Sequence, residues 1–164
     1  MGVKRIRARA VVACGLFVAA GLATVVVGGA EAQQPSPPTA TLQLVQRERD
    51  SRFHFIDVPP LRGARHPTSG DGFVITGAVR DQAGMRVGRL QAVFVLTNVR
   101  REQAQVTATF ILSDGRVVAS GAETRANVDD FAIVGGTGRY TGARGTLRVT
   151  DSRRSTAFLF TFLG

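Results

Sequence analysis

The chain has 164 residues, of which 44% are hydrophobic and 20% are charged, and its formal net charge is +9 at pH 7. This length suits one domain of ordinary size, and the hydrophobic fraction is too high for an intrinsically disordered protein. The single cysteine, Cys14, excludes a disulfide framework and any zinc site built from cysteines.

The first 32 residues have the three parts of an export signal. A basic segment over Met1–Ala10 precedes an uncharged apolar stretch over Val11–Ala30, and Ala30-Glu31-Ala32 places small residues where a signal peptidase reads them. We therefore predict a signal peptide at residues 1–32, which is cleaved before Gln33, and a secreted or extracytoplasmic protein. Two alternatives remain open. About twenty apolar residues can also serve as an uncleaved membrane anchor, and the residues around Cys14 resemble a lipoprotein box.

Removal of the signal peptide changes the charge balance. The remaining 132 residues contain 17 arginines, 11 acidic residues and no lysine or cysteine, so their net charge is +6. These arginines are scattered along the chain. Nucleic-acid-binding proteins usually have a dense basic stripe or aromatic residues for base stacking, and this sequence shows neither pattern. We therefore predict no binding to nucleic acid.

The rest of the sequence reads as a linker followed by strands. Residues 33–50 comprise a Pro/Ser-rich linker and the first strand region, and residues 51–164 form the predicted barrel domain. All six prolines lie at or before Pro67, and proline-free sequence favours central strands, which donate every ladder hydrogen bond. After the signal peptide no window sustains helical spacing. The predicted strands are Thr41–Gln46, Arg52–Val58, Gly72–Val79, Met85–Val99, Gln103–Leu112, Arg116–Glu123, Phe131–Val134, Gly145–Thr150 and Ser155–Leu163.

This pattern predicts an all-β fold, with a spacing typical of a barrel or a sandwich. Some strands are apolar on both faces: Phe158, Phe160 and Phe162 share one face of the last strand, while Leu159 and Leu163 lie on the other. An antiparallel barrel in water needs only one apolar face per strand. We therefore expect the second apolar surface to be buried in an oligomer.

The second half of the chain carries a family resemblance. The glycine-rich run Phe131–Tyr140, followed by Ala143-Arg144-Gly145, resembles the signature of dirigent proteins. Further similarity to dirigent proteins or to allene oxide cyclases, which share the same barrel, lies in Phe55–Val58, Gly70-Asp71-Gly72, Val87–Gln91 and Phe160–Gly164. The resemblance extends from about Arg52 to Gly164.

This resemblance implies an eight-stranded antiparallel β-barrel, a homotrimer, and a hydrophobic pocket inside each subunit. Dirigent proteins steer the coupling of phenoxy radicals that a separate oxidase makes, and their relatives close reactive molecules into rings. The implied ligand is a hydrophobic or phenolic small molecule, held in one conformation away from water, and no cofactor is implied. Two alternatives remain open: a barrel that binds such a ligand without turnover, and a structural or interaction module whose interior is filled by Phe side chains.

The resemblance also assigns roles to acidic residues. Asp57 aligns with the aspartate of the family's early strand, and Glu123 resembles the acid that follows the strand before the glycine motif. Buried acids of this kind have raised pKa values and can donate or accept protons. The alternative for Asp57 is capping of a turn or pairing with an arginine, and for Glu123 it is an exposed loop position. The family arginine before the glycine motif is replaced by Asp129 here, and Arg125 is the nearby candidate to substitute for it.

The remaining candidates belong to the pocket or to the structural motif. They are Phe55, Phe94, Gly135, Gly136, Gly138 and Arg144. The three glycines provide the backbone freedom for positive φ or close approach at a bend; a phosphate-binding loop would need a following helix and a lysine, which are not there. Tyrosines expected in the pocket are replaced, one of them at Phe94 or Leu96. The two histidines, His54 and His66, have no second ligand at useful spacing, so we predict no metal site.

Overall fold

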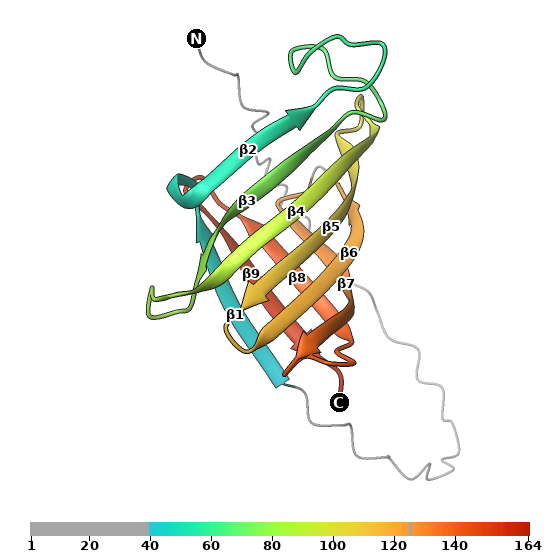
Figure 1. Cartoon of the computed structure of the whole chain (residues 1–164). Coiled ribbons are helices and arrows are strands. Elements are labelled where there is room, and N and C mark those ends of the chain that lie inside the picture. The colour runs from blue at the N-terminus through green and yellow to red at the C-terminus, as the bar shows by residue number, and fades with distance from the viewer. Residues whose placement is uncertain (1–39, 125) are drawn as a thin grey trace, which may run out of the picture.

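A computed structural model describes residues 40–124 and 126–164, which form one antiparallel sheet (Figure 1). The predicted signal peptide, Cys14 and most of the linker lie outside these residues. The strands are β1 (Ala40–Arg47), β2 (Ser51–Ile56), β3 (Gly72–Arg80), β4 (Arg86–Asn98), β5 (Gln103–Leu112), β6 (Gly115–Glu123), β7 (Val128–Gly138), β8 (Gly145–Asp151) and β9 (Ser155–Phe162), with a 3-10 turn, η1 (Glu48–Asp50), between β1 and β2. No helix in the described part is long and apolar enough to cross a membrane.

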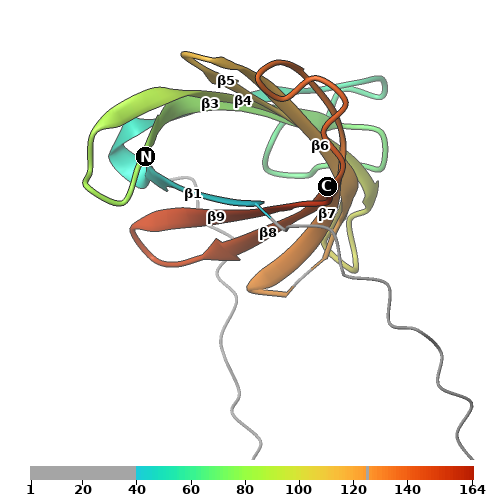
Figure 2. The same ribbon diagram turned by 90° about the horizontal axis from the view of Figure 1, so that it is seen from below.

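Eight of these strands close into a barrel. The order of hydrogen-bonded neighbours is β1-β9-β8-β7-β6-β5-β4-β3, and the pairing of Val45 with Arg80 joins β1 back to β3. Figure 2 shows the ring from one end, with β1, β9 and β8 on one side of the interior and β3, β4 and β5 on the other. The predicted all-β, eight-stranded antiparallel barrel is therefore confirmed, and β2 is one strand more than the barrel needs.

The extra strand arises because the chain changes partner at η1. Up to Arg47 it pairs with β9 as β1, and from Ser51 it pairs with the first half of β3 as β2. The Arg80 guanidinium holds this corner, because its Nε donates to the Asp50 carboxylate at 3.0 Å. As a result, β2 extends beyond β1 at one end of the barrel, where Figure 1 shows it flaring away from β9.

Aromatic side chains fill part of the barrel interior. Phe110 is fully buried and packs edge-on against Phe158 and Phe160, with ring centroids 5.0 and 4.8 Å apart. These residues alternate along β5 and β9 with outward-facing neighbours, as the two-residue period requires. These aromatic rings do not fill the interior along its whole length. The remaining space, which Phe110 and Phe158 border, is the cavity described below.

The glycine motif lies inside a strand rather than after one. The strand predicted to end at Val134 continues as β7 to Gly138, because the glycines stay extended and pair with β6. A bulge at Val134 shifts the register, so that Val118 pairs with Gly135 and Ala119 with Ile133. A side chain on Gly136 would overlap the carbonyl oxygens of Arg116 and Tyr140, and Gly138 has a φ of +63°. The bend therefore requires glycine at positions 136 and 138.

Candidate functional site

A cavity of about 130 Å³ lies in the barrel toward the end where β2 extends beyond β1. The wall on β3, β4 and β5 is apolar, whereas β6, β7, β8, β9 and β1 contribute polar side chains. The residues that line it are Gln46, Phe73, Ile75, Leu90, Ala92, Phe94, Val106, Ala108, Phe110, Ala119, Glu123, Asn127, Asp129, Phe131, Leu147, Val149, Asp151, Thr156 and Phe158.

The apolar wall contains a row of stacked aromatic rings. Phe73 on β3 and Phe94 on β4 are cross-strand partners, and their rings stack with centroids 4.3 Å apart and an angle of 12°. Phe53 of β2 continues the row beyond the cavity, with its ring 5.0 Å from that of Phe73, and 61% of Phe53 remains exposed. Phe94, which was predicted as a pocket residue, lines the cavity as part of this row of stacked rings.

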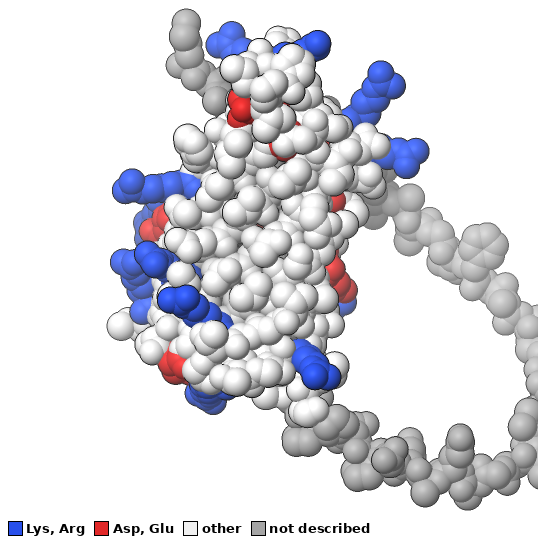
Figure 3. Space-filling view, turned by 45° about the vertical axis from the view of Figure 1, so that its right-hand side comes forward, with Lys and Arg blue, Asp and Glu red and all other residues white. Residues whose placement is uncertain are grey.

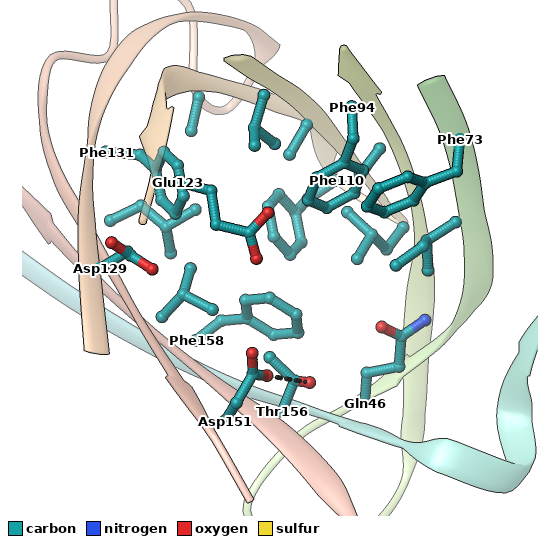
Figure 4. A pocket seen from close by; sticks show the side chains of 18 of the residues that line it. Gln46, Phe73, Phe94, Phe110, Glu123, Asp129, Phe131, Asp151, Thr156 and Phe158 are labelled. Atoms are coloured by element: carbon teal, nitrogen blue, oxygen red, sulfur yellow. Dashed lines mark hydrogen bonds between the residues drawn. The ribbon is translucent and has the colours of Figure 1, made fainter. Parts of the chain in front are cut away.

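Three carboxyl groups line the opposite side of the cavity. Glu123 ends β6, Asp129 lies near the start of β7, and Asp151 ends β8. Figure 4 shows the Glu123 carboxyl group directed into the middle of the cavity, with Asp129 and Asp151 at the margin of the cavity. Hydroxyl groups hold the two aspartates: Thr124 donates to Asp129 at 2.9 Å, and Thr156 donates to Asp151 at 2.7 Å.

This environment changes the acidity of Glu123. Burial in the cavity raises the pKa of its carboxyl group to about 7, and the negative charges of Asp151 and Asp129 act in the same direction. At neutral pH both protonation states of Glu123 are populated. A group in this condition can give or take a proton during a reaction, which is the property that general acid–base chemistry needs.

A buried amide completes the polar side of the cavity. Gln46 of β1 is only 4% exposed, and its Nε2 has no hydrogen-bond partner. Gln46 is the cross-strand partner of Thr156, so it continues the row of polar side chains from Asp151 across β9 to β1 (Figure 4). An unpaired buried donor costs about 1–3 kcal/mol, and most such groups in native proteins have a partner.

Asp57 lies outside this cavity. The chain leaves β2 at Ile56, and the Asp57 carboxylate accepts hydrogen bonds from the backbone N–H groups of Gly63 at 2.7 Å and Arg62 at 3.4 Å. It thus caps a turn of the loop after β2, which was the alternative considered from the sequence. The structure brings Glu123 together with Asp129 and Asp151 and does not bring it together with Asp57.

Asp71 holds the other end of the same loop. Its side chain is fully buried, and its carboxylate accepts hydrogen bonds from the backbone N–H groups of Val58 at 2.9 Å and Thr68 at 2.7 Å. These hydrogen bonds lower the pKa of Asp71 below its usual value, and the one from the Thr68 backbone has the largest effect. The Asp71 carboxylate therefore connects the start of β3 to the loop that begins at Asp57.

We expect Asp71→Asn to release this loop. An amide places an N–H group where the carboxylate accepts a hydrogen bond, so one backbone donor loses its partner. Limited trypsin digestion measures the effect, because Arg62 and Arg65 in the loop are exposed. Cleavage there should become several-fold faster in Asp71→Asn and stay unchanged in Asp114→Asn, which alters an exposed acid in another turn. Equal cleavage rates in the three proteins would contradict this role for Asp71.

The other predicted residues lie away from the cavity. Phe55 is half-buried on β2 opposite Phe73, outside the lining, and Gly135, Gly136 and Gly138 lie further along β7 from its acidic start. Arg144 is exposed, and its backbone carbonyl accepts a hydrogen bond from Leu163 at 2.9 Å. Arg125 lies outside the described residues. Asp151 and Gln46 were not predicted from the sequence, and Asp129 was predicted only as the replacement of the family arginine.

Comparisons with known proteins agree with this architecture. The model of the family described as dirigent-like protein matches residues 43–160. No curated protein matches the sequence. Among solved structures, a pyocyanin demethylase superposes with a TM-score of 0.63 at 21% identity, covering 75% of this chain and 99% of that one.

Two further structures have the same fold. A pterocarpan synthase dirigent protein gives a TM-score of 0.63 at 13% identity, covering 79% of this chain and 97% of that one. An exo-specific intermolecular Diels-Alderase gives 0.61 at 12% identity, covering 79% and 100%. Identities this low establish a shared barrel and nothing finer. The family match spans most of the described barrel, and the resemblance seen in the sequence is thereby confirmed: this chain belongs to the dirigent-like protein family.

Proposed function

We propose that the protein binds a hydrophobic small molecule in its barrel and directs the coupling or cyclisation of that molecule, with Glu123 as proton donor or acceptor. The observation that carries the proposal is one carboxyl group with a pKa of about 7, directed into an otherwise largely apolar cavity. The names of the similar structures, which include a Diels-Alderase and a pterocarpan synthase dirigent protein, support chemistry that forms rings.

The arrangement suits reactions whose products depend on the conformation of a reactive molecule. The stacked Phe73 and Phe94 give the cavity a well-packed aromatic wall against which a ligand can be positioned. The apolar walls keep water away from an intermediate, and Glu123 moves a proton at the one place where the cavity is acidic. Where the reaction is radical coupling, a separate oxidase generates the radicals and the barrel supplies only their orientation.

A second candidate is a binding protein without turnover. The described lining contains no tyrosine and no arginine, so residues of those types that the family resemblance implies are missing from it. The third possibility, a structural module with a filled interior, has less support because the barrel contains a cavity. Retention of an ionisable Glu123 in the cavity favours chemistry over passive storage.

Native mass spectrometry of the protein extracted from its source cells is the first test. One spectrum reports the mature mass, the number of subunits and the mass of any retained molecule. We expect a hydrophobic molecule in the barrel and, in keeping with the proposed export, a mass that corresponds to a chain beginning at Gln33. A protein that carries no molecule and binds no hydrophobic probe would contradict the proposal.

Turnover is then tested with the retained molecule or its precursor. We expect Glu123→Gln to slow conversion about a hundredfold, since positioned acids and bases contribute at least this much, while binding persists. Chiral chromatography of the products measures whether the protein controls the conformation of the bound molecule during the reaction. If the wild type and Glu123→Gln both bind the molecule and neither converts it, the protein is the passive binder described above.

The outer face of the barrel supports a further proposal, assembly as a homotrimer. Val93 and Val95 of β4 are 45% and 43% exposed, and Ile56 of β2 is 40% exposed. The middle of the face seen in Figure 3 carries few charged side chains, and arginines lie mainly around its edges. Apolar area of this kind is usually covered by a partner.

We expect light scattering on the purified protein to give the mass of three subunits, and Val93→Glu to shift that mass toward one. Val134→Glu is the matched control, because Val134 is exposed on β7 at the bulge. A wild-type protein that stays monomeric at high concentration would contradict the trimer.

A further inference from the structure

The fold brings together arginines that are far apart in the sequence. Arg47 ends β1 opposite Ser155, where β9 begins, and the backbone N–H of Glu48 donates to the carbonyl oxygen of Arg154 at 2.9 Å. The turn η1 therefore lies against the turn between β8 and β9 (Figure 1). We call this part of the surface, together with the start of β2 and the end of β3, the basic corner. Its charged residues are the arginines Arg47, Arg49, Arg52, Arg80, Arg153 and Arg154 and the acids Glu48, Asp50 and Asp151.

The basic corner holds most of the excess positive charge of the described chain. Residues 40–124 and 126–164 contain 16 arginines and 11 acidic residues, and the corner has six of these arginines but only three of these acids. Its net charge is therefore +3, and all the other described residues together carry +2. Positive charge concentrated on one part of a surface attracts a partner of negative charge.

This positive charge lies mainly on exposed side chains. The exposed arginines of the basic corner are Arg49, Arg52, Arg153 and Arg154. Arg80 is partly buried, and its Nε lies 3.0 Å from the Asp50 carboxylate, so these two charges balance each other. Asp151 lines the cavity and accepts a hydrogen bond from Thr156. The guanidinium groups on the surface are therefore accessible to a large partner.

An exposed aromatic ring adjoins these arginines. Phe53 follows Arg52 on β2, and 61% of Phe53 is exposed. Peripheral membrane proteins combine such groups: aromatic rings enter the boundary between lipid headgroups and acyl chains, and basic side chains bind the anionic headgroups. The fork of an arginine matches the oxygens of a phosphate. A soluble polyanion would have no use for the ring, so the combination favours a lipid surface.

The basic corner also borders the cavity. Gln46, which precedes Arg47, lines the cavity. Asp151 and Thr156 line it too, and they flank the turn between β8 and β9. Because apolar molecules leave water for an apolar environment, a bilayer collects the kind of guest that this barrel suits. A barrel that docks through the corner holds its cavity beside that store.

We propose that the basic corner binds the surface of an anionic lipid bilayer, with its exposed arginines on the lipid phosphates and Phe53 in the interfacial region. This binding needs no guest in the barrel, so it goes beyond the function proposed above. Loss of the binding would leave that function standing.

Co-sedimentation with vesicles tests the docking. The chain beginning at Gln33 is used, because the apolar stretch over Val11–Ala30 would itself enter a bilayer. We expect this protein at low salt to bind vesicles of equal parts phosphatidylcholine and phosphatidylglycerol on the order of tenfold more tightly than vesicles of phosphatidylcholine alone. Added salt should weaken the binding. Equal binding to the two kinds of vesicle, or none to either, would overturn the proposal.

Two pairs of adjacent arginines provide matched variants. Arg153→Gln with Arg154→Gln removes two charges from the basic corner, and Arg100→Gln with Arg101→Gln removes two from the turn between β4 and β5, which lies away from η1 in Figure 1. All four side chains are exposed, so both variants should fold. We expect the first to weaken binding to the mixed vesicles on the order of tenfold and the second to change it by less than about twofold. Equal losses would mean attraction by overall charge alone and would overturn docking through the corner.

Phe53→Ser separates a bilayer from a soluble polyanion as the partner. We expect this variant to bind the mixed vesicles several-fold more weakly than the wild type and to elute from a heparin column at the same salt concentration. A circular dichroism spectrum and a thermal transition confirm that the variant is folded. Vesicle binding as tight as that of the wild type would show that charge alone acts, and would overturn the bilayer as the partner.

Discussion

At about pH 8, Glu123→Gln is expected to be more stable than the wild type by about 2 kcal/mol in the free energy of unfolding. The folded protein raises the pKa of Glu123 from 4.5 to about 7, so the folded state binds a proton more tightly than the unfolded chain. Stability then falls as the pH rises from the unfolded pKa to the folded pKa and stays low above it. Glutamine resembles the protonated acid and carries no such penalty.

Urea denaturation of both proteins across this pH range measures the difference. The full linkage corresponds to about 3 kcal/mol, and the partial exposure of Glu123 reduces the expected difference to about 2 kcal/mol. The gain should shrink as the pH falls and vanish near the pKa of the unfolded chain. Asp130→Asn should show no gain, because Arg148 holds the pKa of Asp130 below its usual value. A wild-type protein as stable as Glu123→Gln throughout would show that Glu123 is not buried as described.

Gly136→Ala is expected to destabilise the barrel by about 3 kcal/mol, whereas Gly135→Ala changes its stability by less than about 0.5 kcal/mol. The two glycines are neighbours in the same motif, but only one is confined. A methyl group on Gly136 would overlap the carbonyl oxygens of Arg116 and Tyr140, and both belong to backbone that cannot turn aside. Apart from its two chain neighbours, nothing lies within 4 Å of the position that a methyl group on Gly135 would take.

Thermal and urea unfolding of the two variants beside the wild type test this pair. A large loss at both positions would mean that the whole motif tolerates only glycine. A loss at Gly135 alone would contradict the described path of β7 at the bulge. Since neither glycine lines the cavity, ligand binding by the folded fraction should be unchanged.

Much of the fold was predictable, because alternation and turns are local signals. Each predicted strand corresponds to an observed one, and the aromatic positions of the last strand fall inside as the period requires. The end of β7 was misjudged because glycines usually signal a turn, whereas here they are required by the close approach of Arg116 and Tyr140. The partner change at η1 has no local signal, since it depends on which strand lies opposite.

The candidate site was predictable only in part. Glu123 was singled out by the family resemblance, and it lies on the same side of β6 as Val117 and Ala119, both of which are buried. Asp151 and Gln46 were missed because their relation to Glu123 depends on cross-strand register: Asp151 faces Thr156, and Thr156 faces Gln46. Asp57 was predicted to face the pocket but does not line the cavity. It follows β2, which extends past the barrel, and its carboxylate lies in the loop after that strand.

The single pairing of Val45 with Arg80 has a consequence for how the barrel moves. Every other neighbouring pair of barrel strands is held by a ladder of at least six residue pairs, whereas this seam has one. Opening of the ring therefore costs least between β1 and β3, and local opening is how buried amides exchange with solvent. Hydrogen exchange should be fastest along the edges of β1 and β3 that meet at this seam and slowest in β5. The barrel thus has one weakly paired seam, which can open locally while the rest of the sheet stays intact.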